Sequence, residues 1–190
     1  MNPITHALTG WCLAESVPGL SRRGRALVTL AAVAPDLDGL GVIAELATWG
    51  SNHPLRWWTD YHHVLCHNLA FAIVLGVVST VVVDRRRVLV GVLAFVAVHL
   101  HILEDLAGSR GPDGYQWPIA YLYPMAGGPQ LVWSGQWYFN SWPNLAITIV
   151  LLGVTFVLAW RRGESLVGLV SPRGDRVFVQ MLRQRFGEPL

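Results

Sequence analysis

A histidine and two carboxylates lie close together near the end of a long apolar stretch, at His101, Glu104 and Asp105. His101 and Asp105 are four residues apart, so on a helix they share one face. Imidazole and carboxylate groups in this arrangement are typical ligands of a divalent metal. Ionisable groups inside a membrane segment are unfavourable unless they are paired or bind something. The segment therefore predicts either a metal site or a buried pair that fixes helix packing.

A second group of carboxylates follows a proline, in Pro35-Asp36-Leu37-Asp38. We expect the proline to end the preceding helical run, because it cannot continue the hydrogen-bond ladder. In extended backbone after it, the side chains of Asp36 and Asp38 would point the same way. Two converging carboxylates need a cation or a shared proton. The alternative is an ordinary loop at the membrane surface.

Three histidines, His62, His63 and His67, lie within six residues just before another apolar stretch. On a helix His63 and His67 share a face, whereas His62 could reach the same place from a turn if the helix begins near Val64. Sequence spacing leaves open which of His62 and His63 is a ligand. His6 is a further candidate, and spacing alone does not separate a ligand there from a structural histidine.

The elements that must position these groups are membrane helices. Of 190 residues, 53% are hydrophobic and 14% are charged, against about 25% charged in soluble domains. This composition and a mean hydropathy of +0.41 predict an all-α, polytopic integral membrane helix bundle. Because a span needs about 20 residues, we expect about five spans. They correspond to the apolar segments 4–20, 26–49, 64–83, 88–106 and 145–160.

Arginine placement predicts the orientation of these spans. The basic residues cluster between the first and second segments, between the third and fourth, and after the fifth. They are Arg22, Arg23, Arg25, Arg85, Arg86, Arg87, Arg161, Arg162, Arg173, Arg176, Arg183 and Arg185. Because cytoplasmic loops are enriched in basic residues, the N-terminus should lie outside. The candidate ligands then fall in the outer half of a bacterial inner membrane, in a site facing the outer side.

The chain divides into a membrane metal-site domain over residues 1–160 and a basic cytoplasmic tail over residues 161–190. Within the domain, the loop 107–144 is rich in glycine, proline and aromatic residues. It could be an interfacial aromatic belt or a lid that admits an amphiphilic substrate. The tail could lie on the anionic inner leaflet or be solvated.

Four short motifs occur in order along the first 125 residues. They are Thr5-His6, then Pro35-Asp36-Leu37-Asp38, then His62-His63-Val64-Leu65-Cys66-His67-Asn68, then His101 to Asp105, with Trp117-Pro118 after them. In this order they resemble a family of bacterial inner-membrane proteins described as membrane-bound metal-dependent hydrolases, also known as LexA-binding, inner-membrane-associated hydrolases. His63, Cys66 and Asn68 depart from that family's usual arginine, threonine and serine. The order of ligand types is also similar to that of zinc-dependent phospholipase C.

The resemblance implies a metal-dependent hydrolase. The metal ligands that the resemblance implies are His6, Asp36, His62, His67, His101 and Asp105. Zinc is the first expectation, with manganese or iron as alternatives. These groups are too many for one catalytic zinc, which usually keeps three protein ligands and an open position. They fit two ions that share Asp105 or Asp36.

Such a site suits hydrolysis of a phosphoester or lipid-linked substrate by a metal-activated water. Asp38 or Glu104 would take the proton. The expected partners are the lipid bilayer and an amphiphilic substrate, and no nucleic acid. The alternatives are a non-enzymatic membrane protein with a structural metal, a metal or proton transport role, and haem ligation. The inner halves of the last three segments hold almost no polar groups, which argues against a conduit.

Overall fold

The computed structural model describes residues 1–125 and 130–189, and across these residues it contains helices and loops but no β-strand. The only extended pairing there consists of two isolated bridges, Arg110 with Tyr138 and Ile119 with Leu131. The all-α class predicted from the composition is confirmed.

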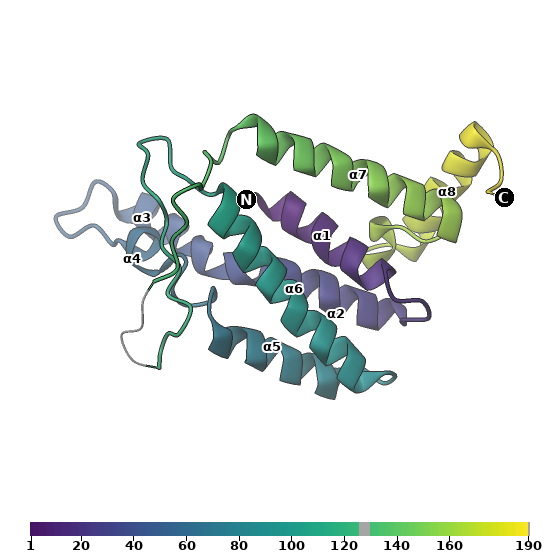
Figure 1. The fold of residues 1–190 in the computed structure, drawn as a ribbon, viewed down its shortest axis with the longest axis horizontal. Coiled ribbons are helices and arrows are strands. Elements are labelled where there is room, and N and C mark those ends of the chain that lie inside the picture. The colour runs from purple at the N-terminus through teal and green to yellow at the C-terminus, as the bar shows by residue number, and fades with distance from the viewer. Residues whose placement is uncertain (126–129, 190) are drawn as a thin grey trace.

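The main helices are α1 (Pro3–Glu15), α2 (Arg22–Val33), α5 (Leu69–Val82), α6 (Arg87–Gly108) and α7 (Trp142–Arg162). The shorter elements are η1 (Ala34–Leu40), α3 (Gly41–Thr48), α4 (Trp57–Tyr61), η2 (Leu166–Leu169) and α8 (Pro172–Phe186). The main helices lie side by side and alternate in direction along the chain (Figure 1). Each predicted apolar segment therefore contributes one pass through a helical bundle.

Three helical segments are long and apolar enough to cross a membrane, namely Arg22–Thr48, Arg87–Gly108 and Trp142–Arg162. Helix α5 is apolar but shorter, with 14 residues, and α1 has 13. Large apolar side chains on the outside of α7, such as Leu145, Ile149 and Val150, are exposed, as expected for a surface that faces lipid. The chain is thus a membrane helix bundle of about five spans.

Close helix packing in the bundle depends on small residues, as is common in membranes. A methyl group at Gly91 of α6 would overlap Thr80 and the carbonyl of Gly76 on α5. A methyl group at Gly10 of α1 would likewise overlap Ala32 of α2. The buried core between these helices consists mainly of small and β-branched apolar side chains.

Helix α5 begins later than the sequence predicts, at Leu69 rather than near Val64. The side chain of Asn68 accepts a hydrogen bond from the backbone N–H of Phe71 and caps the helix. The preceding residues, including His63 with φ of 67°, form an irregular turn. His63 and His67 therefore do not share a helical face.

The expectation of extended backbone after Pro35 is wrong. Residues Ala34–Leu40 form the 3₁₀-helix η1, which continues directly from α2 and into α3. Pro35 lies in the first turn of η1, where its fixed φ is compatible with the helix. In consequence, Asp36 and Asp38 do not converge on one point but face different neighbours.

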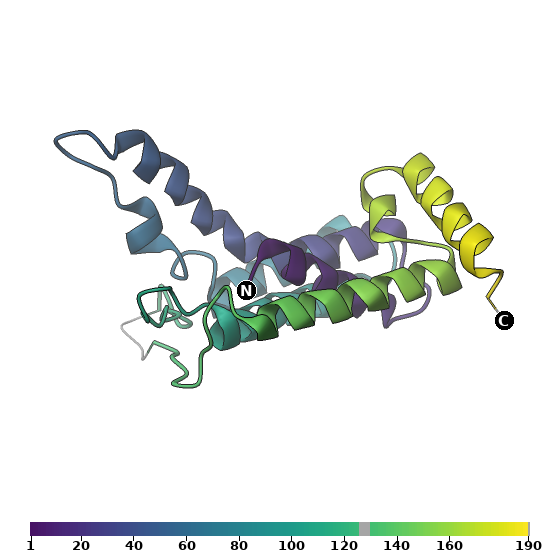
Figure 2. The same cartoon turned by 90° about the horizontal axis from the view of Figure 1, so that it is seen from above.

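The two ends of the bundle differ in chemistry. One end carries the N-terminus, the described parts of the loop 107–144 (107–125 and 130–144) and the α3–α4 hairpin, which projects away from the other helices (Figures 1 and 2). The opposite end carries α8 and the arginine-rich turns. There the buried carboxylate of Glu15 contacts Arg25 at 3.3 Å and Arg162 at 3.1 Å, which ties α1, α2 and α7 together.

Candidate metal centre

Four parts of the chain bring imidazoles and carboxylates together at the N-terminal end of the bundle. His6 comes from the first turns of α1, the aspartates from η1, the histidine motif from the turn before α5, and His101 with Asp105 from the last turns of α6. The residues are far apart in sequence. They meet because antiparallel helices place the start of α1 and α5 beside the end of α2 and α6.

Within the described residues, three overlapping groups have ligand atoms close enough to hold a metal ion. They are His6 with Asp36, His101 and Asp105; Asp38 with His62 and His67; and His63 with His67 and Asp105. All six metal positions that the sequence suggested are present in these groups. His67 and Asp105 each belong to two groups, so the three form one continuous network.

Asp105 lies at the centre of this network. Its Oδ2 is 3.0 Å from His101 Nε2, 3.3 Å from His67 Nε2 and 3.7 Å from His63 Nε2. Its Oδ1 is 3.3 Å from His6 Nε2. The Asp105 residue is 2% exposed. Four imidazole nitrogens therefore point at one buried carboxylate.

The hydrogen bonds of the imidazoles determine their tautomers. His101 Nδ1 donates to the carbonyl of Ala32 at 2.7 Å, and His67 Nδ1 donates to Asp38 at 3.0 Å. With the proton on Nδ1, each Nε2 carries a lone pair, yet the Nε2 atoms of His67 and His101 are 3.0 Å apart. Two lone pairs at this separation repel unless a cation or a proton lies beside them. A histidine whose Nδ1 is held in this way is the usual form of a metal ligand.

Three buried polar atoms in the network have no hydrogen-bond partner among the described residues. They are His6 Nε2, His63 Nδ1 and Asp36 Oδ2. Unpaired buried polar groups are unfavourable and call for a bound species. The donor set and its unpaired atoms thus fit a divalent cation.

Asp38 and Glu104 hold histidines in place. Asp38 accepts hydrogen bonds from His62 Nδ1 at 2.8 Å, from His67 Nδ1 and from the backbone N–H of Cys66 at 3.1 Å. Glu104 accepts from His6 Nδ1 at 2.6 Å and from the hydroxyl of Thr9. Both carboxylates therefore bind imidazole Nδ1 atoms. This arrangement is better suited to orienting the rings than to removing a proton from a substrate.

The structure distinguishes His62 from His63. His63 joins the group around Asp105, whereas His62 belongs to the group around Asp38 and stacks on Trp58 with ring centroids 3.9 Å apart. His63 has φ of 67°, which is an uncommon and strained conformation outside glycine. Burial, followed by the neighbouring His67 and His62, holds the pKa of His63 well below its usual range, so its ring is neutral at pH 7. Helical spacing pointed to His63, although no helix forms there.

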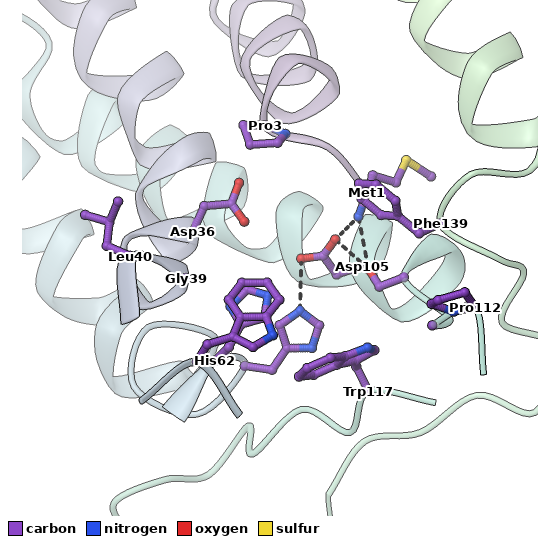
Figure 3. Close-up of a pocket in the computed structure, with 14 residues that line it drawn as sticks. Met1, Pro3, Asp36, Gly39, Leu40, His62, Asp105, Pro112, Trp117 and Phe139 are labelled. Atoms are coloured by element: carbon purple, nitrogen blue, oxygen red, sulfur yellow. Dashed lines mark hydrogen bonds and ion pairs between the residues drawn. The ribbon is translucent and has the colours of Figure 1, made fainter. Parts of the chain in front are cut away.

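A cavity of about 480 Å³ opens beside the network. Its walls include Asp36, Asp105, His62 and His63 together with apolar and aromatic side chains, and Figure 3 shows Asp36, Asp105 and His62 around this space with Trp117 at one side. Trp117 comes from the loop 107–144, and its ring centroid lies 5.6 Å from that of His62 and 5.7 Å from that of His63. The loop thus covers part of the site.

Backbone contacts attach this loop to the site. Gln136 Nε2 donates to the carbonyl of Asp105 at 3.0 Å, and the N–H of Trp137 donates to the carbonyl of Ala107 at 2.9 Å. The N–H of Ala120 donates to the carbonyl of His63 at 3.2 Å. Any movement of the loop is therefore coupled to both the end of α6 and the histidine turn.

The remaining histidines lie outside the network. His99 Nδ1 donates to the carbonyl of Phe95 and its Nε2 is hydrogen-bonded to the Tyr121 hydroxyl, each at 2.8 Å, so His99 has a structural role. His53 lies exposed in the loop between α3 and α4. The α-amino group of Met1, by contrast, contacts Asp105 and donates to Ser109 Oγ at 3.0 Å, which places a basic group beside the central carboxylate.

The chain matches the family model described as YdjM inner membrane protein over residues 1–176, and it belongs to that family. The match includes every residue of the network and places the protein in the inner membrane. No curated protein and no solved structure matches the chain. The family description agrees with the inner-membrane resemblance of the four motifs and names no reaction.

Proposed function

We propose that this protein is a membrane-embedded hydrolase that uses two divalent cations, with zinc as the first expectation, to cleave a phosphoester in an amphiphilic or lipid-linked substrate. The convergence of four imidazole nitrogens on the buried carboxylate of Asp105 carries the proposal. A buried polar network built only for packing would pair its atoms. Within this network, the three unpaired atoms belong to residues of the potential ligand sets.

The ligands divide into two sets that share Asp105. One set is His6, Asp36, His101 and Asp105, and the other is His63, His67 and Asp105. The group around Asp38 is already satisfied by hydrogen bonds, so we assign it a positioning role. Asp105 belongs to both sets and would be shared by the two ions, a role that the sequence suggested for Asp105 or Asp36. His63 takes the ligand place that the resemblance gave to His62.

Two divalent cations in such a site would activate water as a nucleophile and draw charge from the phosphoryl oxygens. The chain supplies the proton handling around them. His62 lines the cavity and has its Nδ1 bound to Asp38, which is the orientation of a general acid supported by a carboxylate. Its other nitrogen is the group we assign to protonate the departing alcohol. Asp38 and Glu104 act on imidazoles and serve as positioning residues.

The walls of the cavity favour a substrate with an apolar part. Leu40, Trp58, Trp117 and Phe139 line the space beside the ligand groups. Leu40 is 58% exposed, and Ile43, three residues later in α3, is 64% exposed. An apolar strip therefore leads from the hairpin surface to the site. An acyl or prenyl chain could follow this strip while its phosphate reaches Asp105.

The network is confined to one end of the bundle, which disfavours a transport pathway. Below it, the contacts between α2 and α6 are made by apolar residues such as Val28, Val90, Ala94 and Val98, all buried. We place the network on the outer side of the membrane, because the arginine-rich turns lie at the opposite end.

The first experiment is metal analysis of protein purified in detergent without chelators, combined with a phosphoesterase assay. Wild type, Asp105→Asn and the control Asp84→Asn are compared, because Asp84 is an exposed aspartate paired with Arg23 far from the site. Near-stoichiometric zinc, manganese or iron is expected in wild type and control and should be lost in Asp105→Asn, together with hydrolysis. Metal without any phosphoesterase activity would favour a structural metal. The absence of metal from wild type would overturn the proposal.

A further inference from the structure

We infer that the site is selective for phosphate groups with a single negative charge, which means phosphodiesters rather than phosphomonoesters. This inference rests on the proposed hydrolase function and adds the substrate class. It follows from the balance of charges around the cavity and from the chemistry of the cavity walls.

Basic side chains are kept away from the site. The chain has no lysine, and twelve of its arginines lie in or after the turns at the opposite end of the bundle. Arg56 and Arg110 remain at the cavity end. Arg56 is paired with Asp60 at 3.6 Å, and neither arginine lines the cavity. Residues 126–129, whose placement is not described, contain no basic residue.

Arg110 is held by other contacts. Its Nε donates to the carbonyl of Gly114 at 3.1 Å, and its guanidinium lies 5.3 Å from the centre of the Tyr138 ring. Both contacts fix it within the covering loop. A phosphate in the cavity would thus meet no guanidinium or ammonium side chain from the part of the chain that the structure describes.

The carboxylates at the site already supply enough negative charge to balance two divalent cations. Four carboxylates, those of Asp36, Asp38, Glu104 and Asp105, are joined through the imidazoles. Two divalent cations would be balanced by these carboxylates. A substrate with one negative charge then leaves the site close to neutral, whereas a second charge has no partner.

Apart from the imidazoles of His62 and His63 and the hydroxyl of Ser109, the walls offer no group that could stabilise a second charge. Trp58, Pro112, Trp117 and Phe139 make much of the lining apolar. Charge in a low-dielectric environment without a partner is strongly unfavourable. The same side chains suit the two organic substituents of a diester, because each substituent can pack against an apolar wall. A phosphate monoester has a single organic substituent and would pack against only one apolar wall.

The reaction is a hydrolysis that balances without any other reactant. The oxygen of one water forms a bond to phosphorus, and one phosphorus–oxygen ester bond breaks. The alcohol leaves with a proton, which we assign to His62, and the other product is a phosphomonoester. That product carries a second negative charge at neutral pH, since the second pKa is about 6. The same charge balance therefore favours its release.

The test compares bis(p-nitrophenyl) phosphate, a monoanion, with p-nitrophenyl phosphate at pH 8, where it is a dianion. Zinc-loaded protein in mixed micelles is assayed as wild type, Leu40→Arg and Leu46→Arg. Leu40 lines the cavity, whereas Leu46 is similarly exposed on α3 and does not line it. We expect wild type to prefer the diester in kcat/KM. Leu40→Arg should lower the diester-to-monoester ratio by about tenfold, and Leu46→Arg should leave it unchanged.

Binding of inorganic phosphate provides a readout that does not depend on turnover. Calorimetry should show weak binding to wild type and to Leu46→Arg, and about tenfold tighter binding to Leu40→Arg. A wild type that prefers the monoester, or a ratio that Leu40→Arg does not change, would overturn the charge selectivity and leave the hydrolase function standing. Failure to cleave either ester, in protein shown to contain metal, would remove the hydrolase function and the selectivity with it.

Discussion

Replacement of Asp105 by asparagine should separate metal binding from the folding of the bundle. The substitution keeps the size of the side chain and removes the one carboxylate that approaches four imidazole nitrogens, at 3.0 to 3.7 Å. In wild type, each ion present at a hundred times its Kd should stabilise the fold by about 2.7 kcal/mol. For a chain of this size that corresponds to a rise in Tm of roughly 5–10 °C for each ion.

The measurement is thermal unfolding in detergent with added zinc and with a chelator. Wild type should show the rise with zinc and lose it with the chelator, whereas Asp105→Asn should respond to neither. Without metal the variant should be at least as stable as wild type, because it has one fewer buried charge beside Asp36. Asp84→Asn, an exposed change at the other end of the bundle, should behave as wild type does.

A zinc-dependent rise in Tm that persisted in Asp105→Asn would refute the central place of this carboxylate. A large loss of stability without metal would instead show that Asp105 holds the fold through Met1 and Ser109, whose contacts it accepts. Either result would require another account of the convergent imidazoles.

Four further predictions follow from the structure. His6→Ala and His63→Ala should each reduce the metal content from two ions to one, because they belong to different ligand sets; loss of both ions from either variant would indicate a single site. Asp38→Asn should weaken zinc binding by about 10- to 100-fold in chelator competition, since it orients His67; an unchanged Kd would contradict its positioning role. Gly91→Leu should destabilise the α5–α6 contact by about 1–3 kcal/mol in detergent unfolding, and a neutral effect would mean that the helices can separate there. A cysteine at the exposed Asn52 should react with impermeant thiol reagents in intact cells, and protection would reverse the proposed orientation.

The helices and the location of the site could largely be predicted from the sequence. Apolar runs of sufficient length indicated the passes through the bundle, and their alternation placed His6, His67 and His101 at one end. This inference requires only that consecutive spans are antiparallel. It does not depend on the details of any side chain.

The local geometry of the ligands could not be predicted in the same way. Pro35 was expected to start extended backbone, but its fixed φ also suits the first turn of a 3₁₀-helix. Asp36 and Asp38 consequently face different partners. Similarly, the cap formed by Asn68 moved the start of α5 and left the preceding histidines in a turn with a left-handed residue.

The roles of Asp38 and Glu104 depended on contacts that span the chain. Glu104 follows His101 by three residues, which suggested a local partner, yet it binds His6 from another helix. Asp38 is bound by His62 and His67 together. Sequence spacing identifies neighbours on one helix. The partners of Asp38 and Glu104 lie on other elements, and they become neighbours only because these elements meet at the same end of the bundle.

The cavity supports the proposal of a catalytic rather than a structural metal centre. A structural zinc usually has four protein ligands and no open position, whereas a catalytic site leaves a position for water or substrate. Here Asp36, His63 and Asp105 belong both to the ligand sets and to the cavity wall. His62 lies on the same wall with its Nδ1 held by a carboxylate. A site built only to stabilise the bundle would gain nothing from an open side or from an oriented histidine facing it, and both features are what a hydrolytic reaction requires.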